Sequence, residues 1–149
     1  MKNIMLKLLN YFYKILKYAE KEENKKKIFQ HKDTQIHSSF RLGNGNILDI
    51  YPHSRISIAK GVCINQNNFI TIKKNAEFIV GEDTYITRAT ISCLEKISIG
   101  KNCILGEGLK IFDHNHKYIK QPFNISKTEF NTAPVKIGNN VWTGLIVLF

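Results

Sequence analysis

The hydrophobic positions of this chain recur with two different periods, and the first period covers the N-terminal segment. Over the first 18 residues, apolar side chains recur at steps of three and four residues, which is typical of an amphipathic helix. A lysine- and glutamate-rich run over residues 21–27 ends this pattern, so the sequence predicts a helix over residues 1–27. We expect its apolar stripe to pack on the rest of the protein or on a partner subunit. The alternative is peripheral contact with an anionic membrane surface. The stripe consists of Ile4, Leu8, Tyr11, Ile15 and Tyr18.

From about residue 47 onward, small or apolar residues recur every six positions in two phases that lie two residues apart. The phase slips between blocks, for instance between Ser92 and Ile99. The first blocks are Ile58, Ile64 and Ile70, preceded by Ile56 and Val62, and then Val80, Ile86 and Ser92 with Phe78, Thr84 and Thr90 ahead of them. The later blocks are Ile97, Cys103 and Leu109 with Ile99, Leu105 and Ile111, and the step returns at Val135, Ile137, Val141 and Thr143.

A six-residue period indicates a triangular coil of short parallel strands, with about 18 residues in each coil. A β-sandwich would instead show longer runs of period two and more frequent hairpin turns. Glycine-led triplets at 81–83, 100–102 and 138–140 follow apolar positions, where we expect corners that need positive φ. The predicted fold is therefore mainly β, a parallel β-helix of hexapeptide coils over residues 47–149. The helix and a linker over residues 28–46 precede it.

One segment, residues 112–134, interrupts the repeat. It begins with Asp113-His114-Asn115-His116 and returns to the repeat through Ala133-Pro134. Loops that leave a regular scaffold frequently carry binding and catalytic residues. We therefore expect the functional site in this loop.

The motifs around the loop resemble those of the hexapeptide-repeat sugar O-acetyltransferases. The matching residues are Ile99-Gly-Lys-Asn-Cys-Ile-Leu-Gly-x-Gly, His116, and Pro134-Val-Lys-Ile-Gly-Asn-Asn-Val-Trp142, and the resemblance covers residues 47–149. It implies a left-handed parallel β-helix, a homotrimer with active sites between neighbouring coils, and acetyl-CoA as the acetyl donor. The implied acceptor is a sugar hydroxyl, for example on a surface polysaccharide, a lipooligosaccharide or sialic acid.

The same resemblance assigns roles to individual residues. His116 matches the histidine that acts as general base, because a neutral imidazole can take the proton of an attacking sugar hydroxyl. His114 and Asp113 are candidates to orient that imidazole or to touch the acceptor, since residues 114 and 116 face the same side of a strand. Trp142 and Gly144 match the region that binds acetyl-CoA, and the alternative for Trp142 is packing at a subunit boundary.

Other function classes remain as alternatives to O-acetylation. They are N-acetylation of an amino sugar and a non-catalytic β-helix scaffold. The pair His114-x-His116 with Asp113 could hold a metal, but the remaining histidines lie far upstream, so no metal is expected. The net charge of +10 would suit nucleic acid, yet no recognition motif accompanies it, so no nucleic-acid partner is expected.

Cysteine usage and hydropathy indicate the compartment. The three cysteines, Cys63, Cys93 and Cys103, contain no C-x-x-C pair and form an odd count, which favours a reducing cytoplasm. None is predicted as a nucleophile. The apolar stretches are shorter than the roughly 18 residues of a membrane span. We expect a cytoplasmic protein, with the inner face of the membrane as the alternative if the helix binds lipid.

The C-terminal residues depart from the family pattern. Family members continue past the tryptophan with further hexads and a segment that binds CoA, whereas this chain reads Trp142-Thr-Gly144-Leu-Ile-Val-Leu-Phe149. Codons chosen for this ending are compatible with loss of one G at Gly144, and the restored frame would read Gly-Ala-Asn-Cys-Thr-Ile. We hypothesise such a frameshift, and we expect residues 1–149 alone to have little activity. A DNA read across codons 140–149 tests this.

Overall fold

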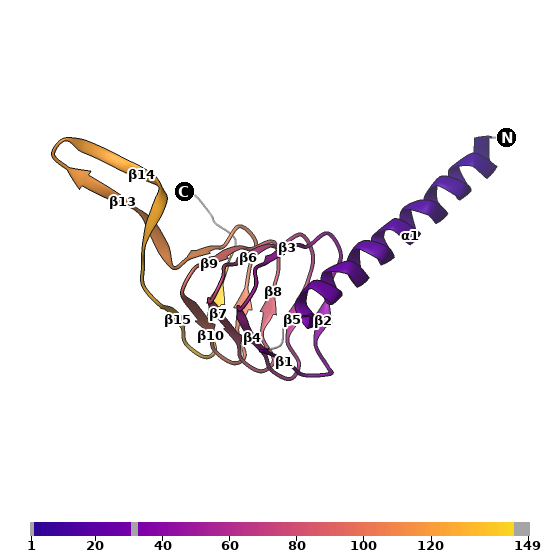
Figure 1. The fold of residues 1–149 in the computed structure, drawn as a ribbon. Helices are drawn as coiled ribbons and strands as arrows, with labels where there is room; N and C mark the ends of the chain where they lie inside the picture. Colours follow the sequence, from indigo (N-terminus) through magenta and orange to yellow (C-terminus); the bar gives the residue numbers. More distant parts are fainter. Residues whose placement is uncertain (1, 31–32, 145–149) are drawn as a thin grey trace.

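The computed structural model describes residues 2–30 and 33–144, and it shows one long helix followed by a solenoid of short strands (Figure 1). The helix α1 (Lys2–Phe29) precedes all strands. The first eight strands are β1 (Thr34–Ile36), β2 (Arg41–Leu42), β3 (Ile47–Ile50), β4 (Arg55–Ile58), β5 (Cys63–Ile64), β6 (Phe69–Ile72), β7 (Glu77–Val80) and β8 (Tyr85–Ile86). The others are β9 (Thr90–Cys93), β10 (Lys96–Ile99), β11 (Ile104–Leu105), β12 (Lys110–Phe112), β13 (His114–Lys120), β14 (Phe123–Thr132), β15 (Val135–Ile137) and β16 (Trp142–Thr143).

Parallel pairing between successive coils builds the three faces of the solenoid. One face has the strand order β1-β4-β7-β10-β15, the second β16-β11-β8-β5-β2, and the third β12-β9-β6-β3. Every neighbour in these three sheets is parallel, and within the described residues only β13 and β14 pair in the antiparallel sense. The predicted stack of parallel hexapeptide coils is thus confirmed.

Inward-facing apolar side chains form continuous ladders along the solenoid axis. On the first face, Ile56, Phe78 and Ile97 occupy successive registers, and all three are buried. On the second face, Leu42, Ile64, Ile86 and Leu105 do the same. Each inward residue therefore packs against the equivalent residue of the next coil, which is how repeat proteins bury a core.

The solenoid begins earlier than the sequence pattern predicted. Residues 28–46 are not a linker: α1 continues to Phe29, while β1 and β2 pair with β4 and β5 as part of a first coil. A six-residue step links Ile36, Leu42 and Leu48, but it is out of phase with the block that begins at Ile56. The polar and glycine residues between these positions concealed the step.

Corner length also differs from the prediction. The buried side chains of Asn46 and Asn68 are hydrogen-bonded across successive coils at a spacing of 22 residues, which is longer than the expected coil. The phase also slips earlier than expected, because Ile91 and Cys93 are buried while the predicted Thr90 and Ser92 are only half-buried. The corner before β9 turns at Arg88, whose φ is 48°, and it shifts the following strand by one position.

Positive φ at the corners belongs to the third residue of each glycine-led triplet rather than to the glycine. Asp83, Asn102 and Asn140 have φ values of 53°, 53° and 58°. Gly81 is needed for a different reason, since a Cβ there would lie 2.7 Å from the carbonyl oxygen of Gly100 in the next coil. Close stacking of corners, not backbone conformation, therefore favours glycine at this position.

The last turns of α1 cover the first coil, and the remainder of the helix projects away from the solenoid (Figure 1). Ile28 is buried in the core, and Asn24 Nδ2 donates to the carbonyl oxygen of Asn46 at 2.7 Å. The expected packing of the apolar stripe on the rest of the protein is wrong for residues 4–18, whose large apolar side chains are exposed. No helix in the described part of the chain is long and apolar enough to cross a membrane.

Candidate functional site

The interruption at residues 112–134 is an ordered β-hairpin that projects from the end of the solenoid opposite α1 (Figure 1). Its two strands, β13 and β14, pair from His114–Thr132 to Lys120–Phe123, with an irregularity between His116 and Tyr118. The backbone N–H of Ala133 donates to the carbonyl oxygen of Asp113 at 2.9 Å and closes the base. The predicted loop is thus a defined element that holds its own side chains in register.

Asp113 anchors the hairpin base to the preceding coil. Its carboxylate accepts hydrogen bonds from the backbone N–H groups of Leu94, Glu95 and Lys96 at 2.8–3.0 Å. The residue is 3% exposed. Burial by itself would raise the pKa of Asp113, but these hydrogen bonds and that of His114 outweigh burial and lower the pKa. The carboxylate is therefore ionised and already fully engaged with donors.

The protonation of the His114 ring follows from its contact with this carboxylate. His114 Nδ1 lies 3.2 Å from Asp113 Oδ1, and an ionised carboxylate can only accept, so Nδ1 carries the proton. In the neutral ring, Nε2 is then the unprotonated nitrogen. The ring packs edge-on against Phe112 and Phe130, at centroid distances of 5.9 and 5.2 Å.

His116 has the same tautomer for a related reason. Its Nδ1 lies 2.8 Å from the carbonyl oxygen of Ser126 on the opposite strand, and a carbonyl oxygen accepts only. Nδ1 must therefore donate, which leaves a lone pair on Nε2. The ring lies 4.6 Å from the ring of Phe130, its cross-strand partner, and the residue is exposed.

These groups line a hollow of about 430 Å³ at the hairpin base. Asp113, His114 and His116 all contribute to its wall, so the structure brings together the three predicted catalytic candidates. A second hollow of about 550 Å³ on the hairpin is lined by His116, Tyr118, Phe123 and others, and His116 lies between the two. The sequence reasoning missed Ser126 and Phe130, whose contacts depend on the hairpin register.

The two residues predicted to bind acetyl-CoA lie elsewhere on this chain. Trp142 is on β16, 76% exposed, and its strand partner Ile104 is 52% exposed. Gly144 follows at the end of the described residues. Neither residue lines the hairpin hollow as far as residues 2–30 and 33–144 show it. The predicted ending at residues 145–149 lies outside the described part.

Cys93 and Cys103 are buried and are not candidate nucleophiles. Burial, and then the nearby charge of Asp113, raise the pKa of the Cys93 thiol to about 12, so the thiolate nucleophile does not form at neutral pH. Cys103 is buried in the core as well. Among the described residues, no group of three or more His, Cys, Asp or Glu side chains is placed to hold a metal ion.

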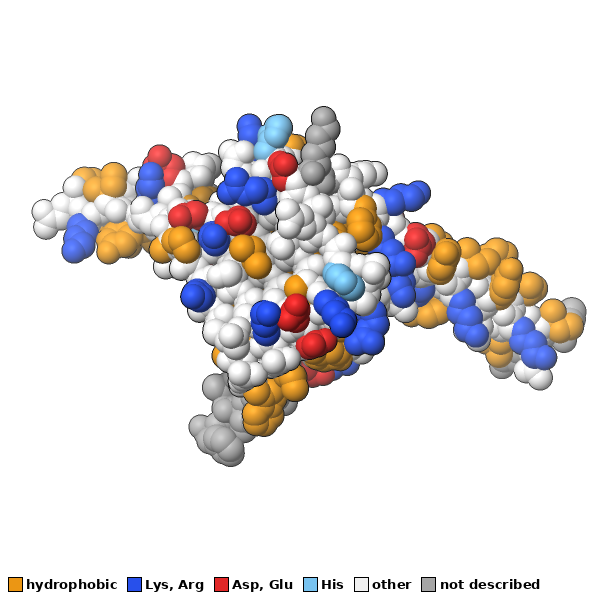
Figure 2. Space-filling view, turned by 90° about the horizontal axis from the view of Figure 1, so that it is seen from below, with side chains coloured by type: hydrophobic (Ala, Val, Ile, Leu, Met, Phe, Trp, Pro, Cys, Tyr) orange, Lys and Arg blue, Asp and Glu red, His pale blue; other side chains and the backbone are white. Residues whose placement is uncertain are grey.

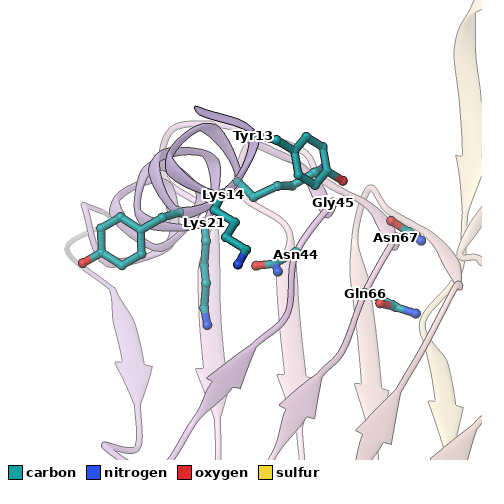
Figure 3. A pocket seen from close by; sticks show the side chains of 9 residues that line it. Tyr13, Lys14, Lys21, Asn44, Gly45, Gln66 and Asn67 are labelled. Atoms are coloured by element: carbon teal, nitrogen blue, oxygen red, sulfur yellow. The ribbon is translucent and has the colours of Figure 1, made fainter. Parts of the chain in front are cut away.

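A separate hollow of about 520 Å³ lies between α1 and two corners of the solenoid (Figure 3). Lys14, Lys17 and Lys21 line its helix side, and Asn44 and Asn67 belong to the opposite side. It is remote in sequence from the hairpin and shares none of its lining residues.

Comparisons with protein-family models, with curated proteins and with solved structures find no match. The functional conclusion therefore depends on the site geometry and on the motif resemblance.

Proposed function

We propose that this protein transfers an acetyl group from acetyl-CoA to a sugar hydroxyl, with His116 as the general base. The observation that supports it most directly is the hydrogen bond from His116 Nδ1 to the Ser126 carbonyl, 2.8 Å long. This bond fixes the tautomer in which Nε2 can accept a proton. A general base needs that lone pair within reach of the acceptor hydroxyl.

In this mechanism, Nε2 of His116 takes the proton of the acceptor hydroxyl as its oxygen attacks. When bound, acetyl-CoA supplies the thioester carbonyl and the thiolate leaving group. The imidazolium is stabilised by the Ser126 carbonyl and by the face of Phe130. His116 then returns its proton to the departing sulfur, so the histidine ends the cycle neutral.

His114 and Asp113 act as positioning residues in this proposal. Asp113 holds the start of β13 on the corner 94–96, and it fixes the His114 ring through Nδ1. The His114 ring in turn packs perpendicular to the ring of Phe130, which also contacts His116. Pre-organisation of this kind keeps a catalytic group near its productive geometry.

The exposed strip on β11 and β16 suits the co-substrate. Trp142 and Ile104 lie side by side with their apolar surfaces in solvent, which fits the apolar parts of the pantetheine arm of acetyl-CoA. In a homotrimer, this strip of one subunit can face the hairpin of its neighbour. We therefore propose a trimer with a left-handed coil, located in the cytoplasm, as the family resemblance implies. The acceptor is a glycan of the surface-polysaccharide, lipooligosaccharide or sialic-acid type.

The test is an acetyl-transfer assay with acetyl-CoA and a panel of sugar acceptors that includes amino sugars. It compares the parent with His116→Ala and His114→Ala. The assay is run in parallel with residues 1–149 and with a chain in which the hypothesised reading frame at Gly144 is restored. We expect His116→Ala to lower kcat by about 10²–10⁴-fold and His114→Ala to lower it less.

The alternative classes predict different results in the same assay. Transfer only to amino groups would identify an N-acetyltransferase. If neither form of the chain transfers acetyl groups, or if His116→Ala is as active as the parent, the proposal is wrong. Inactivity of every form, together with a stable assembly, would favour the scaffold alternative.

A further inference from the structure

The first two thirds of α1 form an unusually apolar free surface. Eleven large apolar side chains between residues 4 and 18 are 45–68% exposed. Figure 2 shows these hydrophobic side chains gathered along the projecting helix, with lysines between them. Surfaces of this kind on soluble domains generally mark interaction sites.

The lysines and the centre of the apolar face lie on opposite sides of the helix, while Tyr13 and Tyr18 flank the lysines at the hollow beside the solenoid. Lys7, Lys14 and Lys21 are spaced by seven residues and therefore form one stripe. Met5 and Phe12 lie about half a turn away from this stripe. Lys14 and Lys21 extend into the space beside the solenoid corner that contains Asn44, as Figure 3 shows. The centre of the apolar face, around Phe12, therefore points away from that corner.

We propose that this apolar face of α1 binds the surface of a membrane that contains anionic lipids. Charge is the first argument. Residues 3–19 carry Lys7, Lys14 and Lys17 and no aspartate or glutamate. Basic residues near an anionic bilayer each contribute about 1 kcal/mol of attraction. A second copy of the same segment would offer these lysines no acidic partner.

The aromatic residues of the segment are the second argument. Tyr11, Tyr13 and Tyr18 are 59–67% exposed on the helix. Tyrosine has an apolar ring and a polar hydroxyl, and it is enriched where lipid tails meet water. The helix has the composition of an element that lies in the plane of the interface rather than one that crosses it. It therefore holds the solenoid beside the membrane.

The experiment is sedimentation of the whole chain with lipid vesicles. One set contains phosphatidylcholine alone, and the other contains equal parts of phosphatidylcholine and phosphatidylglycerol. We expect binding to the anionic vesicles that is on the order of tenfold tighter than to neutral ones and that weakens as salt is added. This binding does not depend on His116, so it is separate from the proposed catalytic function.

A pair of variants tests the helix face itself. Phe12→Glu places a charge at the centre of the apolar face, and we expect it to weaken vesicle binding on the order of tenfold. Glutamate is a good helix former, so circular dichroism should show an intact helix. Ile119→Glu is the matched control, because Ile119 is 61% exposed on the hairpin, and its binding should equal that of the parent.

Three results would overturn the proposal. The first is equal affinity for neutral and anionic vesicles, and the second is undiminished binding of Phe12→Glu. The third is sedimentation velocity that shows self-association through α1, abolished by Phe12→Glu, together with no vesicle binding. That last result would mean that a second copy covers the face.

Discussion

Asp113 shows how one side chain connects the site to the solenoid. It follows β12 directly, yet it accepts hydrogen bonds from residues 17 to 19 positions earlier in the chain. Three backbone N–H groups and one imidazole thus converge on a single buried carboxylate. These contacts are those of a structural anchor, so in the proposed reaction the histidines, and not Asp113, are the candidate reacting groups.

Asp113→Asn should lower the free energy of unfolding at pH 7 by about 2–3 kcal/mol, because hydrogen bonds to a charged acceptor are replaced by weaker ones. The NH₂ group of asparagine would also face backbone N–H groups, which are donors themselves and cannot accept its hydrogen bonds. Urea denaturation measures the change. Asp49→Asn, at an exposed position on β3, is the control and should be nearly neutral.

The contribution of Asp113 should also depend on pH. Its native pKa is lowered, so the stabilisation is complete above the pKa of the unfolded carboxyl, about 4. It declines as the pH falls through the lower native pKa. The stability difference between parent and Asp113→Asn should therefore shrink in acid, and a difference that grew in acid would contradict this assignment.

For single residues, the sequence predicted which residue types gather at the hairpin base, but it did not predict the hydrogen bonds that fix their side chains. The grouping could be predicted because the three residues are near neighbours in the sequence: Asp113, His114 and His116. Ser126 lies ten residues beyond His116, and its carbonyl meets Nδ1 only because of the register of β13 and β14. That register includes an irregularity that no periodic pattern predicts.

At the level of elements, the corners differ from the prediction in which residue has positive φ. The glycine-led triplets were recognised as turns, but positive φ falls on Asp83, Asn102 and Asn140. Asparagine and aspartate tolerate this region better than most residues do. The glycines instead permit contact between stacked backbones. The distance between stacked coils cannot be deduced from the order of residues along the chain. The sequence could therefore predict the corner, but not that its glycine is required by the backbone of the next coil.

Gly81→Ala should destabilise the solenoid by about 1–3 kcal/mol, since its Cβ would overlap the backbone of Gly100. Gly138→Ala is the matched control. It occupies the same position of a corner triplet, and no described atom lies within 4 Å of its Cβ. Its effect should stay within about 0.5 kcal/mol. Thermal unfolding of both variants tests the contrast, and equal losses would refute it.

For the whole molecule, the six-residue step was sufficient to predict parallel stacking. Each side of a coil takes about six residues, so an inward-facing apolar position recurs once on every side. The first coil was missed since its apolar positions are separated by polar and glycine residues. The projection of α1 was also not predicted. An amphipathic pattern shows that a face is apolar, but it does not show what covers that face.

Thiol labelling should report on the solenoid as a cooperative unit. Cys93 and Cys103 lie in neighbouring coils, and both are fully buried. We expect native labelling at pH 8 to be confined to Cys63, because the Cys93 thiol with a pKa of about 12 stays protonated. Cys93 and Cys103 should become reactive at the same urea concentration.

Mass spectrometry of the labelled peptides identifies the sites, and Cys63→Ser should abolish the native signal. Labelling of Cys93 in the absence of urea would contradict the burial. Separate transitions for Cys93 and Cys103 would show that neighbouring coils unfold independently, as repeat arrays do when their interfaces are weak.

The closure of the hairpin at its base gives the fold a modular character. The chain leaves the solenoid after Phe112 and rejoins it at Val135, and the Asp113–Ala133 hydrogen bond brings both ends together. An insertion whose ends meet can change in length or composition at little cost to its host. The hairpin can therefore be exchanged or altered on a constant frame, and under the proposed function such changes would alter the acceptor preference while the coils beneath stay unchanged.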